Sequence, residues 1–324
     1  MNSTVFPSSQ QRFGAQINKF EVTVVCIHAF LTISTVFGNY LVIRAFIKFP
    51  HLRTASNSIL VSLSMADLLM VPVFISRLVS NVMTKSPKKM CNITSMVSFT
   101  LNATIILHLA MISLERLIAI KFALRYHTMV TSRRALLATM GLWLYAILSC
   151  IAFPQAFKAD GRETFREFIG GLSPCRFRCR RMQCSSLNSK SVLGYLVFLV
   201  TAHLFLPIAI VVVSYSYIFN IACKQRRRII QDERTLQSIT LTMKREMKAA
   251  RNEAILVSLC LFSFVPLLVI LCLHFSSATV DITKQHLSVA YIVASLSAFW
   301  NPLIYCWKSQ HFRIAFKRLL KGNH

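Results

Sequence analysis

Residues 297–305 read Ser-Ala-Phe-Trp-Asn-Pro-Leu-Ile-Tyr and lie near the C-terminal end of a long apolar stretch. A proline inside a membrane-length helix is costly, because it removes a backbone donor and its ring clashes with the preceding turn. Lipid tolerates such a break only where neighbouring helices, polar side chains or water satisfy the freed carbonyl. Asn301 and Tyr305 are four residues apart and therefore share one helical face. The stretch predicts a kinked membrane helix whose polar face packs inside a bundle.

The composition of the 324-residue chain is typical of a membrane protein. Hydrophobic residues make up 55% and charged residues 15%, and the mean hydropathy is +0.55. Soluble domains average about 45–50% apolar and 25% charged residues. The formal net charge of +26 would suit a nucleic acid, but apolar spans interrupt the basic residues, so we expect no nucleic-acid partner. Met1 to Phe20 is polar and lacks the apolar core of a cleavable signal peptide.

Seven segments have the roughly 20 apolar residues that a helix needs to cross the lipid bilayer. They are Val22–Phe46, Ser58–Val82, Met96–Ile120, Ala135–Phe157, Val192–Ala222, Ala254–Phe275 and Leu287–Trp307. Residues 310–320 are shorter and basic, which predicts an amphipathic helix on the membrane surface. We therefore expect an all-α membrane protein with three parts. These are an extracellular N-terminus over residues 1–21, a seven-transmembrane helix bundle over residues 22–307, and a short amphipathic eighth helix with a cytoplasmic tail over residues 308–324.

The orientation of the chain follows only modestly from lysine and arginine, because the loops on both sides carry them. Two other features favour an extracellular N-terminus. Asn2-Ser3-Thr4 is an N-glycosylation sequon, which is used only on that side. The cysteines in or beside the expected outer loops, where disulfides persist, are Cys91, Cys175, Cys179 and Cys184.

Short motifs in the seven segments resemble those of the rhodopsin-like (class A) G-protein-coupled receptors. They are Gly38-Asn39, Leu63-Ser64-Met65-Ala66-Asp67-Leu68-Leu69, Glu115-Arg116-Leu117, Trp143, Pro207 with Tyr215, Pro266, and Asn301-Pro302-Leu303-Ile304-Tyr305. Each motif alone is a weak signal, but together they stand in the family's order over about residues 20–321. Residues 124–127 and 64–67 are similar to those of the amine, adenosine and melatonin receptors.

The resemblance implies a plasma-membrane receptor, not an enzyme, that transmits an extracellular ligand signal to a heterotrimeric G protein by opening its cytoplasmic side. Its further partners would be the lipid bilayer and arrestin. The alternative is a multi-span transporter or channel, for which broken helices and several intramembrane charges are expected. The lack of internal repeats disfavours that alternative.

The same resemblance assigns residues that couple the receptor to the G protein. Arg116 is the family's transmission residue, and a buried guanidinium must be paired. Glu115 is one expected partner. Glu246 is either the second partner or a solvated member of the charged run 244–248. Tyr215 and Tyr305 are expected to move toward Arg116 in the active state.

Two proline-containing positions complete the expected conformational switch. Phe264 stands two residues before Pro266, where the family usually carries a tryptophan, and inherits the role of a rotating aromatic by position. A phenylalanine lacks the indole donor. Asn301 and Pro302 form the corresponding hinge in the seventh segment.

Asp67 is a carboxylate in the middle of the second segment, which costs about 2.5–3.5 kcal/mol on insertion scales, so it should face the bundle interior. In the family this position holds a sodium ion, and the expected neighbours are Asn39, Ser297, Ala298 and Asn301. Ala298 and Ile105 stand where the family often supplies hydroxyl ligands. The match to a sodium site is weaker here, because a hard cation needs several oxygen ligands. A sodium ion near Asp67 and a protonated or water-bridged Asp67 both stay open. No other cofactor is expected.

The resemblance also implies a disulfide from Cys91 to the second outer loop. The spacing to Pro207 favours Cys184, with Cys179 second, although connectivity does not follow from sequence. The expected ligand cavity opens outward among the third, fifth, sixth and seventh segments. Its candidate residues, each with core packing as the alternative, are Ser98, Phe99, Asn102, Cys184, His203, Phe264, His274 and Tyr291.

Two positions indicate which ligand classes are disfavoured. Ser98 stands where amine receptors carry an aspartate, which disfavours a monoamine, and the seventh segment lacks the lysine that binds retinal in opsins. Residues 175–181, Cys-Arg-Phe-Arg-Cys-Arg-Arg, are arginine-rich and suit an acidic ligand, since guanidinium groups bind carboxylate and phosphate through two hydrogen bonds. A solvated basic loop is the alternative.

Overall fold

The computed structural model describes residues 19–82, 88–149, 194, 197–231, 251, 254–255, 257–270, 273 and 284–321. Within these ranges the chain forms helices and no strands. The helices are α1 (Lys19–Lys48), η1 (Pro50–Leu52), α2 (Ala55–Leu69), α3 (Val71–Val82), α4 (Lys88–Lys121), α5 (Tyr126–Met129), α6 (Ser132–Ile147), η5 (Thr201–Phe205), α10 (Leu206–Gln231), α12 (Lys284–Lys308) and α13 (Gln310–Leu320). A further apolar helix covers Val257–Ile270.

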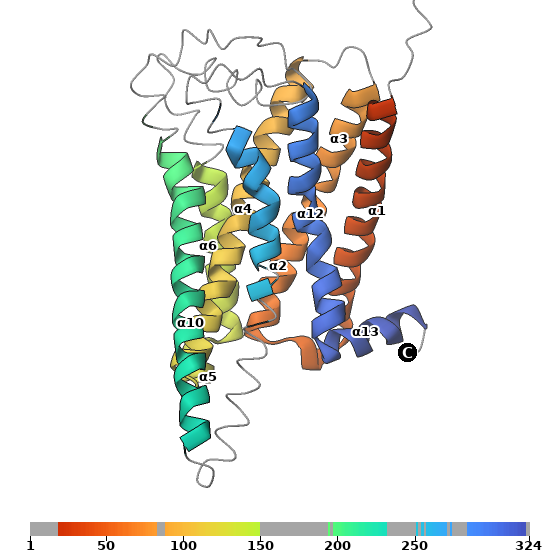
Figure 1. Cartoon of the computed structure of the whole chain (residues 1–324). Coiled ribbons are helices and arrows are strands. Elements are labelled where there is room, and N and C mark those ends of the chain that lie inside the picture. The colour runs from red at the N-terminus through yellow and green to blue at the C-terminus, as the bar shows by residue number, and fades with distance from the viewer. Residues whose placement is uncertain are drawn as a thin grey trace, which may run out of the picture.

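The long helices stand side by side in a bundle, and α13 lies across one end of it (Figure 1). We call the end that holds α5 and α13 the lower end, and the opposite end the upper end. Helix α4 is central because it packs against α2, α6 and α10, whereas α1 packs against α2, α3 and α12. Apolar side chains such as Leu63, Ile105 and Leu109 fill the interior.

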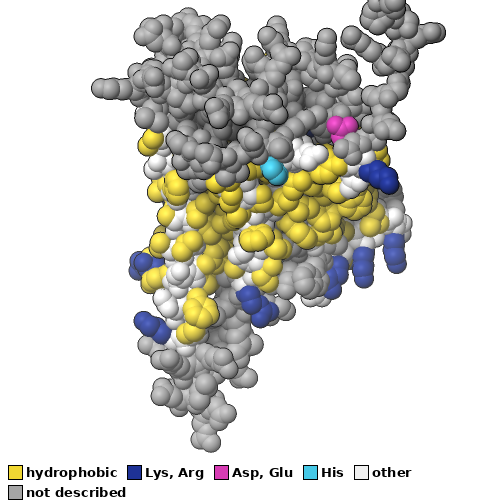
Figure 2. Space-filling model, turned by 45° about the horizontal axis from the view of Figure 1, so that its top comes forward, with side chains coloured by type: hydrophobic (Ala, Val, Ile, Leu, Met, Phe, Trp, Pro, Cys, Tyr) yellow, Lys and Arg dark blue, Asp and Glu magenta, His cyan; other side chains and the backbone are white. Residues whose placement is uncertain are grey.

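The outside of the bundle is apolar, as a lipid-facing surface must be. Figure 2 shows hydrophobic side chains over most of the described surface, with several Lys and Arg side chains toward its lower margin. Exposed residues of this kind include Phe30 and Ile33 on α1, Leu137 on α6, and Val213 and Phe219 on α10. Four described segments are long and apolar enough to cross a membrane: Lys19–Lys48, Ala55–Val79, Ile93–Lys121 and Val197–Ile221. Helix α6, Val257–Ile270 and α12 correspond to the other three expected spans.

The second expected span is not one unbroken helix. The structure ends α2 at Leu69 and begins α3 at Val71, with Met70 between them. Pro72 explains the break, because it has no N–H to donate to the carbonyl four residues earlier. Helices α2 and α3 together cover the span that was expected at Ser58–Val82.

The proline in α12 is accommodated in the way that the sequence predicted. Pro302 lies inside the helix Lys284–Lys308 and cannot donate to the carbonyl of Ala298. That carbonyl instead accepts a hydrogen bond from Asn39 Nδ2 on α1, at 3.1 Å. A side chain from a neighbouring helix thus satisfies the freed backbone group.

Helices α1 and α12 approach each other closely at Gly38. A Cβ atom built on Gly38 would lie 2.6 Å from Cβ of Pro302, and the proline Cγ would be nearer still. Only glycine fits this contact, which explains why residue 38, next to Asn39, is a glycine.

Helix α13 confirms the expected amphipathic helix at residues 310–320. The side chain of Ser309 caps it by accepting a hydrogen bond from the backbone N–H of Phe312. Phe312 and Phe316 are buried against the bundle, while Arg313 and Lys317 are exposed.

Candidate functional site

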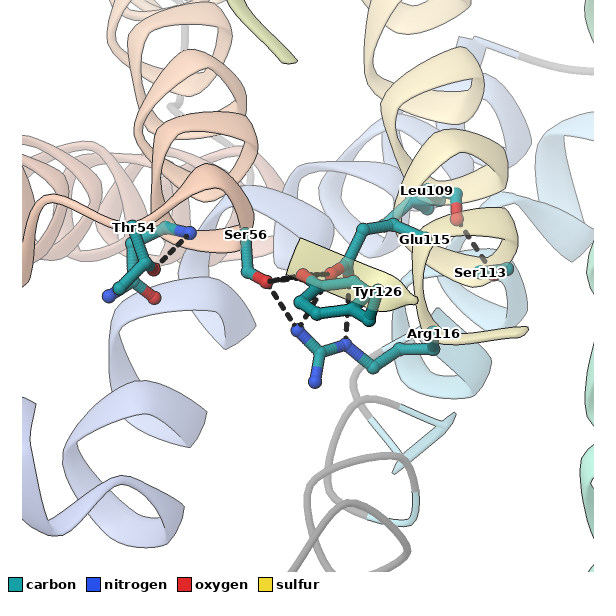
Figure 3. Close-up of polar contacts among 8 residues, drawn as sticks. Thr54, Ser56, Leu109, Ser113, Glu115, Arg116 and Tyr126 are labelled. Atoms are coloured by element: carbon teal, nitrogen blue, oxygen red, sulfur yellow. Dashed lines mark hydrogen bonds and ion pairs between the residues drawn. The ribbon is translucent and has the colours of Figure 1, made fainter. Parts of the chain in front are cut away.

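A cluster of four polar side chains lies at the lower end of α4 (Figure 3). Arg116 Nε donates to Glu115 Oε2 at 2.7 Å, and Arg116 Nη2 donates to Ser56 Oγ at 2.6 Å. Glu115 and Arg116 are both buried. The partnership of Arg116 with Glu115 was expected, whereas Ser56 was not. We call Ser56, Glu115, Arg116 and Tyr126 the Arg116 cluster.

Tyr126 ties the short helix α5 to this cluster. Its hydroxyl donates to Glu115 Oε1, which also accepts a hydrogen bond of 2.7 Å from Ser56 Oγ. Burial and the negative Glu115 carboxylate raise the pKa of Tyr126 above its ordinary value. The phenol therefore stays protonated and remains a donor. One carboxylate thus holds together residues from α2, α4 and α5.

The expected partners from the fifth to seventh segments are described only in part. Tyr215 on α10 is half-buried. Glu246 lies outside the described residues, and so does the side chain of Tyr305, although its backbone belongs to α12. The Arg116–Glu246 pair therefore stays a prediction.

A second cluster surrounds Asp67 in the middle of the bundle. Asp67 is fully buried, and its Oδ2 accepts a hydrogen bond from Asn301 Nδ2. Ser297 Oγ donates to Ala294 O on its own helix at 2.8 Å. Within the described ranges, three buried oxygens here have no hydrogen-bond partner: Asn39 Oδ1, Ser64 Oγ and Asp67 Oδ1. Among the described residues, this cluster therefore has oxygens without a hydrogen-bond partner, and one of them belongs to the Asp67 carboxylate.

Trp143 belongs to a third polar group that joins α2, α4 and α6. Its Nε1 donates to Ser62 Oγ at 3.0 Å, and Ser62 Oγ lies 2.9 Å from His108 Nε2. His108 Nδ1 lies 2.8 Å from the carbonyl of Thr104, which can only accept. The proton therefore resides on Nδ1, and Ser62 donates to Nε2. Sequence reasoning singled out Trp143 but missed the two residues that it depends on.

At the upper end, Ser98 contacts an arginine that the sequence analysis did not select. Arg77 Nη2 on α3 donates to Ser98 Oγ at 2.5 Å, and the guanidinium carbon lies 3.8 Å from the centre of the Tyr291 ring. Asn102 Nδ2 donates to the Ser98 carbonyl at 2.8 Å. The structure therefore brings together Ser98, Asn102 and Tyr291, three of the ligand-site candidates.

The other ligand-site candidates are more scattered. His203 is buried, with its ring stacked on Tyr145 at 5.2 Å, its Nε2 2.8 Å from Ser149 Oγ and its Nδ1 3.2 Å from Leu199 O. These contacts favour the packing alternative for His203. Of the remaining candidates, Phe99 is half-buried and Phe264 is buried. Pro266, two residues after Phe264, is half-buried. The side chains of Cys91, Cys184 and His274, and the sequon at Asn2, lie outside the described residues.

Comparison with known proteins gives the class. Residues 38–305 match the model of the 7 transmembrane receptor (rhodopsin family). The chain is 26% identical to the Adenosine receptor A2b of Gallus gallus, over 94% of this chain and 90% of that receptor. It is 28% identical to the D(1) dopamine receptor of Carassius auratus, over 91% of this chain and 87% of that receptor. It is also 25% identical to Melanopsin of Felis catus, over 98% of this chain and 74% of that protein.

The chain belongs to the rhodopsin family of seven-transmembrane receptors, since the family model spans most of its length. It is a G-protein-coupled receptor and not an enzyme, and the transporter alternative has no support. Its family makes it a multi-pass protein of the plasma membrane, whose partners are an extracellular ligand and a G protein.

Proposed function

We propose that the receptor signals by opening the lower end of its bundle, which faces the cytosol, after a ligand binds near the extracellular upper end. A ligand shifts such an equilibrium when it binds the open state better than the closed one. The observation that carries the proposal is the Arg116 cluster, in which Arg116 is held on Glu115 and Ser56. Opening would release this guanidinium for the G protein, and arrestin would use the same end.

The orientation has support from the distribution of charge. The lower end carries exposed Arg133 and Arg134 at the start of α6, and exposed Arg313, Lys317 and Arg318 on α13. Basic residues near span ends favour the cytosolic side, whose lipid leaflet is anionic. With that side inside, Asn2 is extracellular and open to glycosylation, and a disulfide from Cys91 to Cys184 forms in an oxidising space.

The residues expected to lie near the ligand argue against a monoamine ligand. Ser98, whose hydroxyl accepts a hydrogen bond from Arg77, stands at the position where amine receptors carry an aspartate. It offers a ligand ammonium a neutral hydroxyl in place of a carboxylate that would pair with it. The absence of a lysine from residues 287–307 supports the further proposal that the receptor is not an opsin.

The experiment that tests the function is agonist-free nucleotide exchange. Membranes from cells expressing the receptor should load radiolabelled GTPγS onto at least one member of a panel of purified heterotrimeric G proteins, above the level of untransfected membranes. A receptor with verified surface expression that stimulates none of them, also in the Tyr126 variant below, would contradict the proposal.

Tyr126→Phe is expected to raise this basal exchange by about tenfold or more, because a hydrogen bond to a charged group contributes about 1.5–3 kcal/mol and about 1.4 kcal/mol is a factor of ten. The change removes the hydroxyl that donates to Glu115 and leaves the ring in place. Tyr40→Phe is the matched control, since Tyr40 is exposed on α1. An unchanged basal rate in Tyr126→Phe would show that this contact does not hold the closed state.

We also propose that a sodium ion binds at Asp67. Asp67 Oδ1, Ser64 Oγ and Asn39 Oδ1 lack partners among the described side chains and would be its protein ligands, with the carboxylate supplying the charge. Sodium chloride is then expected to lower basal exchange relative to choline chloride of equal ionic strength, and Asp67→Asn should abolish that difference. A sodium effect that persists in Asp67→Asn would assign the ion to another site.

A further inference from the structure

A short helical turn at the lower end of the bundle carries an exposed hydroxyl group. Thr128 lies in α5, which has four residues and no buried side chain. Its side chain is exposed, and its Oγ1 donates to the carbonyl of Arg125 at 2.8 Å. A single turn with so little buried surface opens locally at low cost, so an enzyme can reach this hydroxyl.

Two guanidinium groups flank Thr128. Arg125 stands three residues earlier, and its side chain is exposed. Arg134, at the start of α6, reaches back to α5, where its Nη1 donates to the carbonyls of Thr128 at 2.8 Å and Met129 at 3.0 Å. Both carbonyls are neutral, and neither arginine forms an ion pair with another described residue. The surroundings of the hydroxyl are therefore positively charged and suit a negatively charged group.

The other hydroxyl groups near this turn lack the same combination. Thr131 is half-buried, and its Oγ1 caps α6 by accepting a hydrogen bond from the backbone of that helix. Ser132 is exposed, but no arginine stands three residues before it. Ser56 does follow an arginine by three residues, but it is half-buried and its hydroxyl is bonded within the Arg116 cluster. Thr128 alone among these four is exposed and follows an arginine at this spacing.

We propose that Thr128 is phosphorylated by a protein kinase that recognises an arginine three residues before the acceptor, and that Arg125 and Arg134 then bind the phosphate. Charge patterns of this kind distinguish kinase substrates. A P–O bond forms between Thr128 Oγ1 and the terminal phosphorus of ATP, the bond from that phosphorus to ADP breaks, and the hydroxyl proton passes to the base of the kinase. The inference rests on the proposed function, because kinases and ATP act on the side to which the lower end is assigned.

The phosphate reinforces the closed state of the bundle. Phosphothreonine carries a charge of about −1.5 to −2 and three strong acceptor oxygens. Pairing with Arg134 ties α5 to α6, and pairing with Arg125 closes the turn on itself. Tyr126 lies in the same turn and donates to Glu115, so a firmer α5 holds the Arg116 cluster more tightly.

The first test uses purified full-length receptor in lipid nanodiscs without G protein, incubated with ATP and a purified kinase of this recognition class. Mass spectrometry of the peptide that spans residues 125–134 is expected to locate the phosphate on Thr128. Thr128→Ala should abolish incorporation into this segment, and Arg125→Gln should lower it by about tenfold, since the kinase loses a charged contact. Ser132→Ala, the matched control, should be modified as the wild type is. An unmodified Thr128, or full incorporation in Arg125→Gln, would overturn the assignment.

The second test measures whether the two arginines bind the phosphate. Backbone amides of residues 126–130 should exchange hydrogen for deuterium roughly twofold to tenfold more slowly in the phosphorylated receptor than after phosphatase treatment, because exposed ion pairs are individually weak. Arg134→Gln should still be phosphorylated but lose this protection. Equal protection in that variant would exclude Arg134 as a phosphate partner.

The functional consequence is measured separately. Phosphorylation of the wild-type receptor should lower basal nucleotide exchange on the G protein, and an unchanged or higher rate would rule out the closed-state role. The first two measurements use no G protein. Their failure therefore leaves the nucleotide-exchange test of the proposed function unaffected.

Discussion

Replacing Arg116 with alanine is expected to abolish stimulated nucleotide exchange. The substitution removes the guanidinium proposed to bind the G protein and leaves the buried Glu115 without its cationic partner. Breaking a buried ion pair by removing one member costs about 3–5 kcal/mol, so the closed cluster is lost as well. The two losses act in opposite directions on activation. Coupling should nevertheless disappear, because an open bundle without Arg116 offers the G protein no charged contact at this position.

The measurement combines Arg116→Ala with Tyr126→Phe, because no ligand is needed to activate the second variant. At equal surface expression, the basal exchange raised by Tyr126→Phe should fall to the level of untransfected membranes in the double variant. Arg116→Lys is the matched control. It keeps the charge but loses the planar fork, so intermediate exchange is expected. Full exchange in the double variant would show that Arg116 takes no part in coupling.

Enlarging Gly38 is expected to have the largest effect on folding. A methyl group at this position would overlap the ring of Pro302, and both residues are on helix backbones that cannot move independently. Overpacking a well-filled interior costs about 1–3 kcal/mol. Gly38→Ala should therefore lower the unfolding temperature of the purified receptor, and Gly38→Val should prevent most of it from reaching the cell surface.

Gly141→Ala is the control for this prediction. A Cβ atom on Gly141 of α6 would meet nothing within 4 Å, so the same chemical change adds no clash. This variant should keep the unfolding temperature and surface expression of the wild type. If Gly38→Ala were as stable as Gly141→Ala, α1 and α12 would have to separate more easily than their contact indicates.

The sequence predicted those parts of the site that depend on a single helix or on a family motif. The Asn301-Pro302 break required a polar partner from elsewhere, and Glu115 stands beside Arg116 in the chain. It did not predict that Asn39 supplies the bond to the freed Ala298 carbonyl, since periodicity shows which face is inward but not which helix lies opposite.

Arg77, Ser56 and Tyr126 were missed for related physical reasons. An arginine near the end of an apolar span is ordinarily expected to extend its charge to the membrane surface. Only the packing of α3 against α4 shows that Arg77 is buried instead. Ser56 and Tyr126 are 59 and 11 residues from Glu115, so their shared carboxylate follows from the tertiary fold alone.

The tight fit of Gly38 against Pro302, together with the bond from Asn39 to Ala298, has a consequence for how the receptor moves. Two helices in such close contact move together as one rigid body. Any displacement of α12 during signalling must carry α1 along with it. Relative sliding is then confined to the surfaces that this pair shares with the rest of the bundle, and spin labels on the two helices should keep a constant separation while both shift against α4.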